Sequence, residues 1–460
     1  MRAWSVLAAA GLALGSAVQA AQSPLVVGYY AGWLKNQTAG VDLQKYTHIN
    51  VAFGVPDASG HIGFPDKFSL QQAVAEIHGA KAKALLSLGG WTGSSQMSTI
   101  VKSQIASNAL IAEIVNHVAS NGFDGIDIDW EYPGRPGNTC NVVDAANDTP
   151  NLLRFLQQLR TTLDARFGSG SKLITMAVST TPFAVNGTPL TDVSPFAKVT
   201  DFINVMIYDI NGIWMDQTGP NAPLYYEDGK GTAASFATAI KAWTKAGWPA
   251  SKLNVGLPFY GRSVTTEGNM LDDRDNQYQA LTKVLPKGDS EDTVTTDTCA
   301  NTTGVSGIWM YRHLRDEGVL SGPTTAAKPW VRSWDMITHT PWLFNPTTKQ
   351  YITYDDVDSI KSKVEYAASM GVAGVMVWSL YMDYQSELLN VIHTWGTSTK
   401  GIADGAQCSS DGLVSCRDYD GVTSTYFVCD HGKWQQFSCH PTTVCFSNGA
   451  RSLYCGWREN

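Results

Sequence analysis

Short apolar runs alternate along most of this chain with longer amphipathic segments. The runs are apolar at nearly every position, as is typical of strands that are buried on both faces of a parallel sheet. The predicted strands are residues 25–30, 48–54, 83–90, 123–131, 173–180, 201–209, 253–261 and 371–380. Apolar positions recur with helical spacing at residues 69–82, 103–120, 151–167, 232–246 and 355–370.

Eight strands that mostly alternate with helices predict an α/β protein with a (β/α)8 TIM barrel. A doubly wound open sheet is the competing fold, but no glycine-rich phosphate loop follows the first strand. Residues 263–351, between strands seven and eight, form a segment too long for an ordinary loop. This segment contains strand-like runs at 305–311 and 351–354, so we expect a small α+β insertion domain there.

The N-terminus has the pattern of a secretory signal peptide at residues 1–20. Arg2 is followed by an apolar run at 6–14 and a small-residue cleavage site at 18–20. The run is too short to cross a bilayer, so we expect a secreted, extracellular protein, and association with a cell wall stays open. Sequons for N-glycosylation begin at Asn36, Asn147, Asn186 and Asn301.

Composition narrows the class of protein. The chain has 460 residues, of which 43% are hydrophobic and 16% charged, which predicts a large folded core. Its net charge of −8 disfavours nucleic acid and anionic membranes as partners. We expect a monomer with a catalytic barrel at 21–395, a Gly/Ser/Thr-containing linker at 396–407 and a small module at 408–460.

Three carboxylates lie on one face of the predicted strand 123–131. Asp127, Asp129 and Glu131 are two residues apart, which is about 6–7 Å between neighbours along a strand. Burying three acids together is costly because like charges resist ionising in a low dielectric. A solvated edge strand and a metal-binding strand are alternatives, although no calcium-loop spacing or histidine cluster supports the second. We favour acid catalysis, because crowded carboxylates keep a proton near neutral pH.

Four motifs resemble those of glycoside hydrolase family 18, the chitinases. Asp124-Gly-Ile-Asp-Ile-Asp-Trp-Glu131 resembles the DGxDxDxE signature, and Ser87-Leu-Gly-Gly-Trp91 resembles the SxGG motif. Met206-Ile-Tyr-Asp209 resembles the MxYD motif, and Trp378 is similar to a tryptophan at the end of the eighth strand. The resemblance covers residues 24–395, with the motifs in the family's order.

This resemblance implies a retaining, substrate-assisted cleavage of β-1,4 bonds in chitin and chito-oligosaccharides. Glu131 would be the general acid and base, and the carbonyl oxygen of the sugar's own N-acetyl group would be the nucleophile. Asp129 would orient that acetamide and share a proton with Asp127 behind it. Tyr208 would support the acetamide oxygen. No metal or organic cofactor is implied.

Other side chains at the predicted strand ends would bind the sugars. These substrate-binding candidates are Tyr30, Phe53, Trp91, Met206, Asp209, Tyr260, Arg262 and Trp378. Trp378 would form the apolar floor under the distorted sugar. Purely structural alternatives exist for two polar residues: Asp124 ties down the start of its strand, and Arg262 forms a salt bridge.

The 8 cysteines divide into two groups. Cys140 and Cys299 belong to the same predicted barrel face, where a disulfide between them is possible. The other six lie between Cys408 and Cys455, in a segment too small for a core without staples. Their 15 possible pairings stay open, and a zinc site is the alternative.

The C-terminal segment resembles the small fungal chitin-binding module of family 19 in its cysteine spacing and in the run from Cys429 to Trp434. The alternative is a disulfide-rich tail without affinity for a ligand. For the whole chain, two other functions stay open: a non-catalytic chitin lectin, and an endo-β-N-acetylglucosaminidase that acts on N-glycans. The presence of Glu131 disfavours the first, and the insertion and tail disfavour the second.

Overall fold

A computed structural model of the chain describes residues 23–33, 38–64, 68–395, 405, 408, 411–416, 424–441, 443–447 and 453–457. The predicted signal peptide, Asn36 and nearly all of the predicted linker lie outside the described residues. In the part described, no helix is both long enough and apolar enough to cross a membrane.

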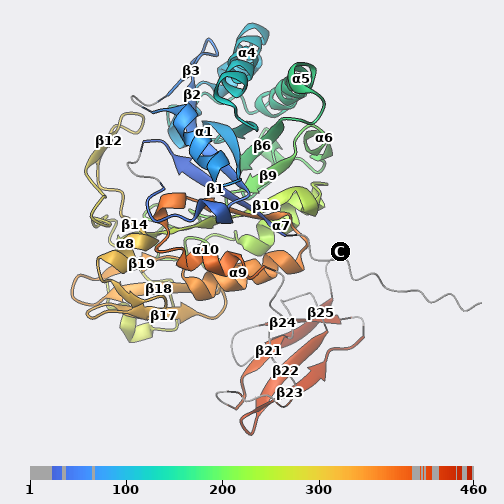
Figure 1. Cartoon of the computed structure of the whole chain (residues 1–460). Helices are drawn as coiled ribbons and strands as arrows, with labels where there is room; N and C mark the ends of the chain where they lie inside the picture. The colour runs from blue at the N-terminus through green and yellow to red at the C-terminus, as the bar shows by residue number, and fades with distance from the viewer. Residues whose placement is uncertain are drawn as a thin grey trace, which may run out of the picture.

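The core of the molecule is a closed barrel of eight parallel strands (Figure 1). The strands are β1 (Leu25–Ala31), β2 (His48–Pro56), β4 (Lys83–Gly89), β5 (Gly125–Asp129), β6 (Leu173–Val178), β9 (Phe202–Val205), β10 (Leu253–Pro258) and β20 (Gly374–Trp378). Each strand pairs in parallel with its neighbours, and β1 closes the sheet by pairing with both β2 and β20. The predicted TIM barrel is confirmed, and the open doubly wound sheet is wrong.

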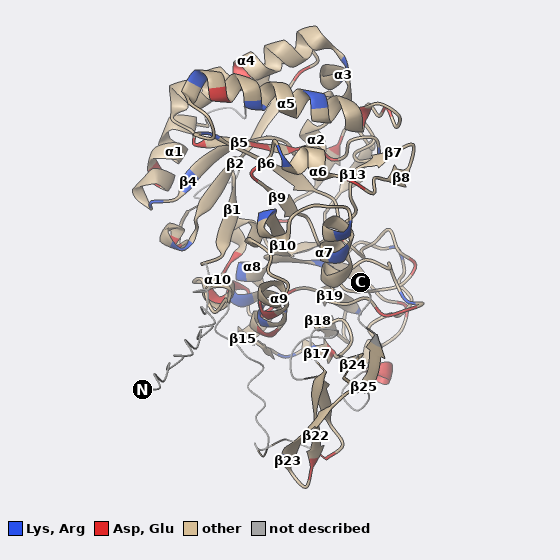
Figure 2. Ribbon diagram, turned by 90° about the vertical axis from the view of Figure 1, so that its right-hand side faces the viewer, with Lys and Arg blue, Asp and Glu red and all other residues tan. Residues whose placement is uncertain are grey.

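Helices cover the outside of the barrel. The five predicted helices are present as α1 (Leu70–Gly79), α4 (Gln104–Asn121), α5 (Asp148–Phe167), α7 (Phe236–Lys245) and α9 (Val357–Ser369). Shorter helices are α2 (Gly90–Gly93), α3 (Met97–Lys102), α6 (Ser194–Ala197), α8 (Tyr311–Asp316) and α10 (Glu387–Ile392). Charged residues mark α4 and α5 on the outside, and red also marks the sheet at β5 (Figure 2).

Capping side chains explain where several helices begin. Ser69, Ser103 and Asp356 each accept a hydrogen bond from a backbone N–H in the first turn of α1, α4 and α9. Helix α4 ends at Asn121 and is capped by Gly122, whose φ of 78° is left-handed and favours glycine. In α1, α4 and α9, the apolar residues at helical spacing are buried against the sheet, as the periodicity predicts.

The insertion begins earlier than predicted. Strand β10 ends at Pro258, and Tyr260 already belongs to β11 (Tyr260–Thr265). Phe259 makes the turn, because its N–H donates to the Trp378 carbonyl and its carbonyl accepts from the Tyr311 N–H. The sixth barrel strand is also shorter than predicted, since β9 ends at Val205.

The insertion is an antiparallel sheet with small hairpins. Strand β11 pairs with β14 (Ile308–Met310) and β19 (Gln350–Thr353), and the sheet continues through β18 (Thr340–Asn345) to β17 (Val331–Asp335). Short pairs of strands are β12 (Thr295–Asp297) with β13 (Thr302–Gly304) and β15 (Leu320–Gly322) with β16 (Thr325–Ala326). Outside the insertion, β3 (Ile62–Gly63) pairs with β2, and β7 (Ala184–Val185) pairs with β8 (Thr188–Pro189). The disulfide between Cys140 and Cys299 is formed.

The C-terminal module is a small β structure. It contains the sheet β21 (Val414–Cys416), β22 (Thr425–Asp430) and β23 (Lys433–Ser438), and the pair β24 (Thr443–Ser447) and β25 (Leu453–Trp457). Disulfides join Cys408 to Cys429, Cys416 to Cys445 and Cys439 to Cys455. The predicted disulfide framework is confirmed, and the zinc alternative is wrong because all six cysteines are paired.

The inside of the barrel differs from a purely apolar core. Its apolar cluster is small and contains Val27, Tyr29, Ala52, Phe202 and Met376. Beside it lie polar side chains with no exposed surface, namely Asn50, Ser87, Asp127, Thr175, Asn204 and Asn254. Hydrogen bonds organise part of this interior: Asp127 accepts from Ser87 and Thr175, and Asn254 Nδ2 donates to Asn204 Oδ1 at 3.1 Å. The side chain of Asn50, in contrast, has no partner among the described residues.

Candidate active site

Strand β5 divides its side chains between two environments. Ile126 and Ile128 belong to the large apolar core between the barrel strands and the surrounding helices. Asp127 and Asp129 contact the barrel interior, with 0% and 3% of their surfaces exposed. Since β5 lies between β4 and β6, the alternative of a solvated edge strand is wrong.

Asp127 is held by three hydroxyl groups from three other barrel strands, the adjacent β4 and β6 and the more distant β1. Its Oδ2 accepts from Tyr29 Oη at 2.8 Å and from Ser87 Oγ at 2.7 Å, and its Oδ1 accepts from Thr175 Oγ1 at 2.6 Å. Burial raises the pKa of Asp127, and the hydrogen bonds from these hydroxyls oppose the rise. Asp127 is therefore fixed in place with both oxygens satisfied.

Asp129 has the opposite situation. Its Oδ1 is buried and has no hydrogen-bond partner among the described residues. Burial, followed by the charges of Glu131 and Asp127, raises the pKa of Asp129 well above its ordinary value. These surroundings favour the protonated form of Asp129, and its Oδ1 is free to accept a further hydrogen bond.

Glu131 lies two residues beyond the end of β5. Burial raises the pKa of Glu131 to about 7, and the charge of Asp209 adds to the rise, while a hydrogen bond with Tyr132 opposes it. A carboxylic acid with this pKa is partly protonated and partly ionised near neutrality. It can therefore donate a proton in one step and accept a proton in another.

The glycines after Ser87 bring β4 close to the end of β5. Gly89 has a φ of 105°, and a Cβ atom there would lie 2.2 Å from the Asp129 carbonyl oxygen. Only glycine tolerates both this backbone conformation and this close approach. Trp91 follows directly in α2, and its side chain is 49% exposed at the same end of the barrel.

Aromatic and sulfur-containing side chains surround the acids from β2, β20 and the segment after β9. Trp378 ends β20, and its ring stacks on Phe53 with a centroid separation of 5.8 Å. Met206 and Tyr208 pack against the same inner cluster. Tyr208 Oη lies 3.8 Å from Met376 Sδ, and burial raises the pKa of Tyr208 well above its ordinary value.

Asp209 forms a compact polar group with Tyr260 and Arg262. Its Oδ1 accepts from Tyr260 Oη at 2.5 Å and from Arg262 Nε at 2.6 Å. Arg262 also lies over the ring of Trp214, with Cζ 5.2 Å from the centroid. Arg262 thus forms a salt bridge, as its structural alternative expects, and its guanidinium lies against a tryptophan that is 51% exposed.

Tyr30 is the predicted site residue that the structure places apart from the others. Its ring lies 5.9 Å from that of Phe68 and packs against the outer core of the barrel. Alternation along β1 instead directs Tyr29 inward, where it contacts Asp127 and Trp378. Asp124 accepts hydrogen bonds from the Ala84 N–H and His78 Nε2, so it ties down the strand as its structural alternative proposes.

Sequence reasoning missed Tyr29, Trp33, Thr175 and Trp214. Trp33 is 49% exposed, and its ring stacks on Phe53 with a separation of 5.8 Å and lies 6.2 Å from that of Trp378, so Trp33, Phe53 and Trp378 form a compact aromatic cluster. The exposure of Trp33 and Trp214 distinguishes them from buried tryptophans, but the sequence does not show which tryptophans are exposed.

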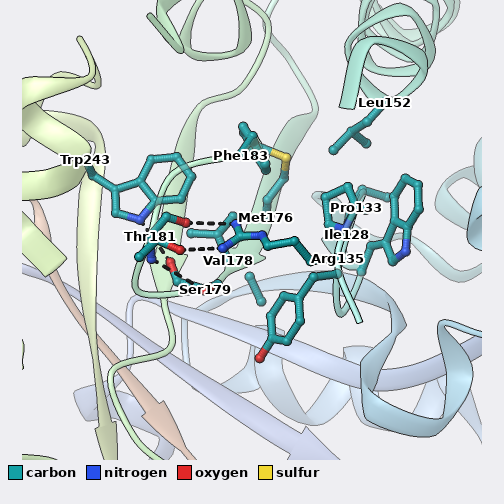
Figure 3. Close-up of a pocket in the computed structure, with 13 residues that line it drawn as sticks. Ile128, Pro133, Arg135, Leu152, Met176, Val178, Ser179, Thr181, Phe183 and Trp243 are labelled. Carbon is teal, nitrogen blue, oxygen red and sulfur yellow. Dashed lines mark hydrogen bonds between the residues drawn. The ribbon is translucent and has the colours of Figure 1, made fainter. Parts of the chain in front are cut away.

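A small cavity of about 10 Å³ lies on the other face of β5. It is lined mainly by apolar side chains, including Ile128, Met176 and Trp243, and by Arg135, which donates to the Thr181 carbonyl (Figure 3). Arg135 also donates to the carbonyl of Pro182. This volume is close to that of one water molecule and far too small for a sugar. The cavity therefore belongs to the packing behind the strand and not to the candidate site.

Comparison with family models matches both parts of the chain. "Glycosyl hydrolases family 18" matches residues 25–383, and "Carbohydrate binding domain (family 19)" matches residues 397–450.

In the described part of the chain, no group of three or more His, Cys, Asp or Glu side chains is placed to hold a metal ion.

Relatives and solved structures agree with the first match. A chitinase-like effector of Moniliophthora roreri is 33% identical over 386 residues, which is 79% of this chain and 91% of the relative. The crystal structure of a chitinase from Rhizomucor miehei superposes with a TM-score of 0.73 and 34% identity, covering 80% of this chain and 99% of that one. The Group IV chitinase of Ostrinia furnacalis in complex with allosamidin gives a TM-score of 0.68 at 27% identity, with coverage of 81% and 98%.

Proposed function

The chain belongs to glycosyl hydrolase family 18, and from this premise we propose that it hydrolyses the β-1,4 bonds of chitin and chito-oligosaccharides with retention at the anomeric carbon. One observation carries the proposal. Glu131, with a pKa of about 7, lies beside Asp129, a buried acid whose Oδ1 has no partner among the described residues. This pair offers a proton donor together with an acceptor for an amide N–H.

In the first step, Glu131 transfers its proton to the glycosidic oxygen as the bond to the anomeric carbon breaks. The carbonyl oxygen of the substrate's N-acetyl group forms the new bond to that carbon, which gives an oxazolinium ion. Asp129 accepts a hydrogen bond from the acetamide N–H. This bond orients the nucleophile and stabilises the positive charge. Asp127 shares a proton with Asp129 and is itself fixed by its three hydroxyl partners.

In the second step, the Glu131 carboxylate removes a proton from water while the water oxygen attacks the anomeric carbon. The bond to the acetamide oxygen breaks, and the N-acetyl group is restored. Two displacements at one carbon give net retention. Tyr208 supports the acetamide oxygen with its hydroxyl, and its raised pKa keeps this hydroxyl protonated as a donor.

Aromatic rings at the same end of the barrel bind the neutral sugar chain. Trp378 is the floor of the central position, and Phe53 and Trp33 continue the aromatic surface beside it. Trp91 and Trp214 are both about half exposed and are available for further sugars. Asp209, Tyr260, Arg262 and Met206 line the neighbouring positions.

We further propose that residues 408–460 bind insoluble chitin and that residues 21–395 catalyse. The match to the family 19 carbohydrate-binding model supports the first role. Four disulfides are typical of an oxidising compartment, which supports secretion after removal of residues 1–20.

A second candidate function is chitin binding without cleavage, because one of the relatives is named a chitinase-like effector. The carboxyl group of Glu131 and its raised pKa favour catalysis over this reading. Cleavage within N-glycans is the third candidate, and comparison of the two substrates on the purified protein distinguishes it from chitin hydrolysis.

The test is hydrolysis of a soluble N-acetylglucosamine oligomer by the wild type, by Glu131→Gln and by Glu267→Gln. We expect Glu131→Gln to lose activity by several orders of magnitude while it still binds the oligomer, because it keeps the shape and loses the acid. Glu267 is exposed in the insertion and serves as the matched control. A wild type that binds without cleaving would establish the lectin, and an active Glu131→Gln would place the acid elsewhere.

A further inference from the structure

Glu131 lies outside the hydrogen-bonded ladder of the strand that precedes it. Strand β5 ends at Asp129, and residues 130–147 form a long connection without helix or strand before α5. A general acid must nevertheless be held within a fraction of an ångström of its working position. The ladder of the barrel cannot supply this restraint, because it stops two residues too early.

Two side chains from other segments hold the backbone of Glu131. The Glu131 N–H donates to Ser94 Oγ at 2.9 Å, and the Glu131 carbonyl accepts from Asn141 Nδ2 at 2.7 Å. Ser94 is fully buried and also donates to the Gly90 carbonyl at 2.8 Å. Both polar groups of the Glu131 backbone are therefore anchored by side chains.

The connection folds back so that Asn141 reaches Glu131. A Cβ atom on Gly137 would lie 1.9 Å from the Glu131 carbonyl oxygen, so this close approach requires glycine. The side chain of Asn138 accepts from the Cys140 N–H at 3.1 Å, and its carbonyl accepts from the Asn141 N–H at 2.9 Å. This turn sets the direction of the Asn141 side chain.

A disulfide fixes the same turn to the insertion. Cys140, adjacent to Asn141, is bonded to Cys299, which lies 159 residues further along the chain. Cys299 is in the turn between β12 and β13, where Asp297 accepts hydrogen bonds from the N–H groups of Cys299 and Ala300. The bond therefore limits the movement of the turn that carries Asn141.

We infer that Asn141, restrained by the Cys140–Cys299 disulfide, is a positioning residue for the general acid. This inference rests on the proposed function for the role of Glu131, but the contacts do not depend on it. Asn141 acts through the Glu131 carbonyl and touches no reacting atom. Its Oδ1 is buried and has no partner among the described residues, so the bond to Glu131 is the polar interaction that accounts for an amide here.

The test compares Asn141→Leu and the double variant Cys140→Ser/Cys299→Ser with Asn116→Leu. Leucine has nearly the shape of asparagine but no donor. Asn116 is exposed on helix α4, away from the connection that carries Asn141, and serves as the control. We expect the first two variants to lower kcat on a soluble oligomer by about 10- to 100-fold with KM within about twofold, and to shift the alkaline limb of the pH profile.

A second measurement is independent of turnover. Hydrogen–deuterium exchange in the peptide that contains Glu131 should be faster in Asn141→Leu and in the double variant than in the control. Unchanged kcat, pH profile and exchange in both variants would overturn the inference, even if Glu131→Gln is inactive. An inactive wild type would instead contradict the proposed function, and the exchange rates would still decide the role of Asn141.

Discussion

The barrel site and the C-terminal module are stabilised over very different distances along the chain. In the barrel, Asp127 is held by hydroxyl groups that lie 98, 40 and 48 residues away in sequence. In the module, disulfides close spans of 21, 29 and 16 residues. The barrel buries Asp127 and Asp129 inside a large core, whereas the buried cluster in the described part of the module consists of Cys416, Cys439 and Cys445.

This contrast explains where each region keeps its aromatic side chains. The large barrel can cover Tyr29 and most of Trp378 and still leave a few tryptophans at its rim. The small module buries the ring of Phe427, which is 1% exposed, but leaves Phe437 and Tyr454 46% and 55% exposed. Changes inside the barrel should therefore alter turnover, and changes in the module should alter binding to solid substrate.

The largest effect should come from Asp129→Asn in the barrel. The amide has the same shape, but it cannot provide a carboxylate for the acetamide N–H or share a proton with Asp127. We expect kcat on a soluble oligomer to fall by about 100- to 1,000-fold, as for loss of one group that stabilises a transition state. Binding of the full chain to insoluble chitin should stay unchanged, because the module is intact. A loss of less than tenfold in kcat would contradict the role proposed for Asp129.

The next effect is the pH dependence of the barrel. Burial raises the pKa of Glu131 to about 7, so its acid form is present below that pH and is lost above it. We expect kcat/KM to fall about tenfold for each pH unit above pH 7, because this ratio reports the free enzyme. Asp209→Asn removes a negative charge that raises the pKa, so it should move this alkaline limb to lower pH. A limb that stays in place in this variant would contradict the contribution of Asp209.

The same contrast shows what sequence could predict. Acids at every second position of an apolar strand predicted the buried carboxylates, because strand geometry is local. Tyr29 was missed in favour of Tyr30, since an isolated pair of tyrosines does not say which one faces the interior. The extent of the insertion was also wrong, because the turn at Phe259 depends on bonds to Trp378 and Tyr311.

The sequence could not predict which cysteines pair with one another. Six cysteines in a short segment predicted a stapled module, but their partners are chosen by the fold and not by spacing. Likewise, Trp33 and Trp214 lie in segments whose sequence has no periodic pattern. Their exposure follows from long-range packing, such as the contact of Trp214 with Arg262.

A smaller effect is expected from Cys416→Ser/Cys445→Ser in the module. Both cysteines are fully buried, and their disulfide closes a 29-residue span. Its loss should therefore lower the free energy of unfolding of the module by about 2–4 kcal/mol. We expect about tenfold weaker binding to insoluble chitin and unchanged kcat on a soluble oligomer. Deletion of the residues after Trp395 should likewise weaken binding to insoluble chitin and leave kcat on a soluble oligomer unchanged. Equal loss on the soluble and insoluble substrates would mean that the two regions are not independent.

The smallest effect should come from a single ring on the module. Phe437 in β23 is 46% exposed and stacks on Tyr426 with a centroid separation of 5.5 Å and an interplanar angle of 18°. Such a flat pair suits the face of a sugar ring, and one aromatic contact is worth about 0.5–1.5 kcal/mol. Phe437→Ala should therefore weaken binding to insoluble chitin by about two- to tenfold, measured by depletion from solution.

Gln435→Ala is the matched control for this change. Gln435 is exposed two residues before Phe437 on the same strand, so both side chains point to the same face. If only Phe437→Ala weakens binding, the ring contributes to the chitin-binding face. If neither variant changes the affinity, the polymer contacts another face of the module, and Tyr454 in β25 becomes the residue to replace, because its exposed ring belongs to the other sheet.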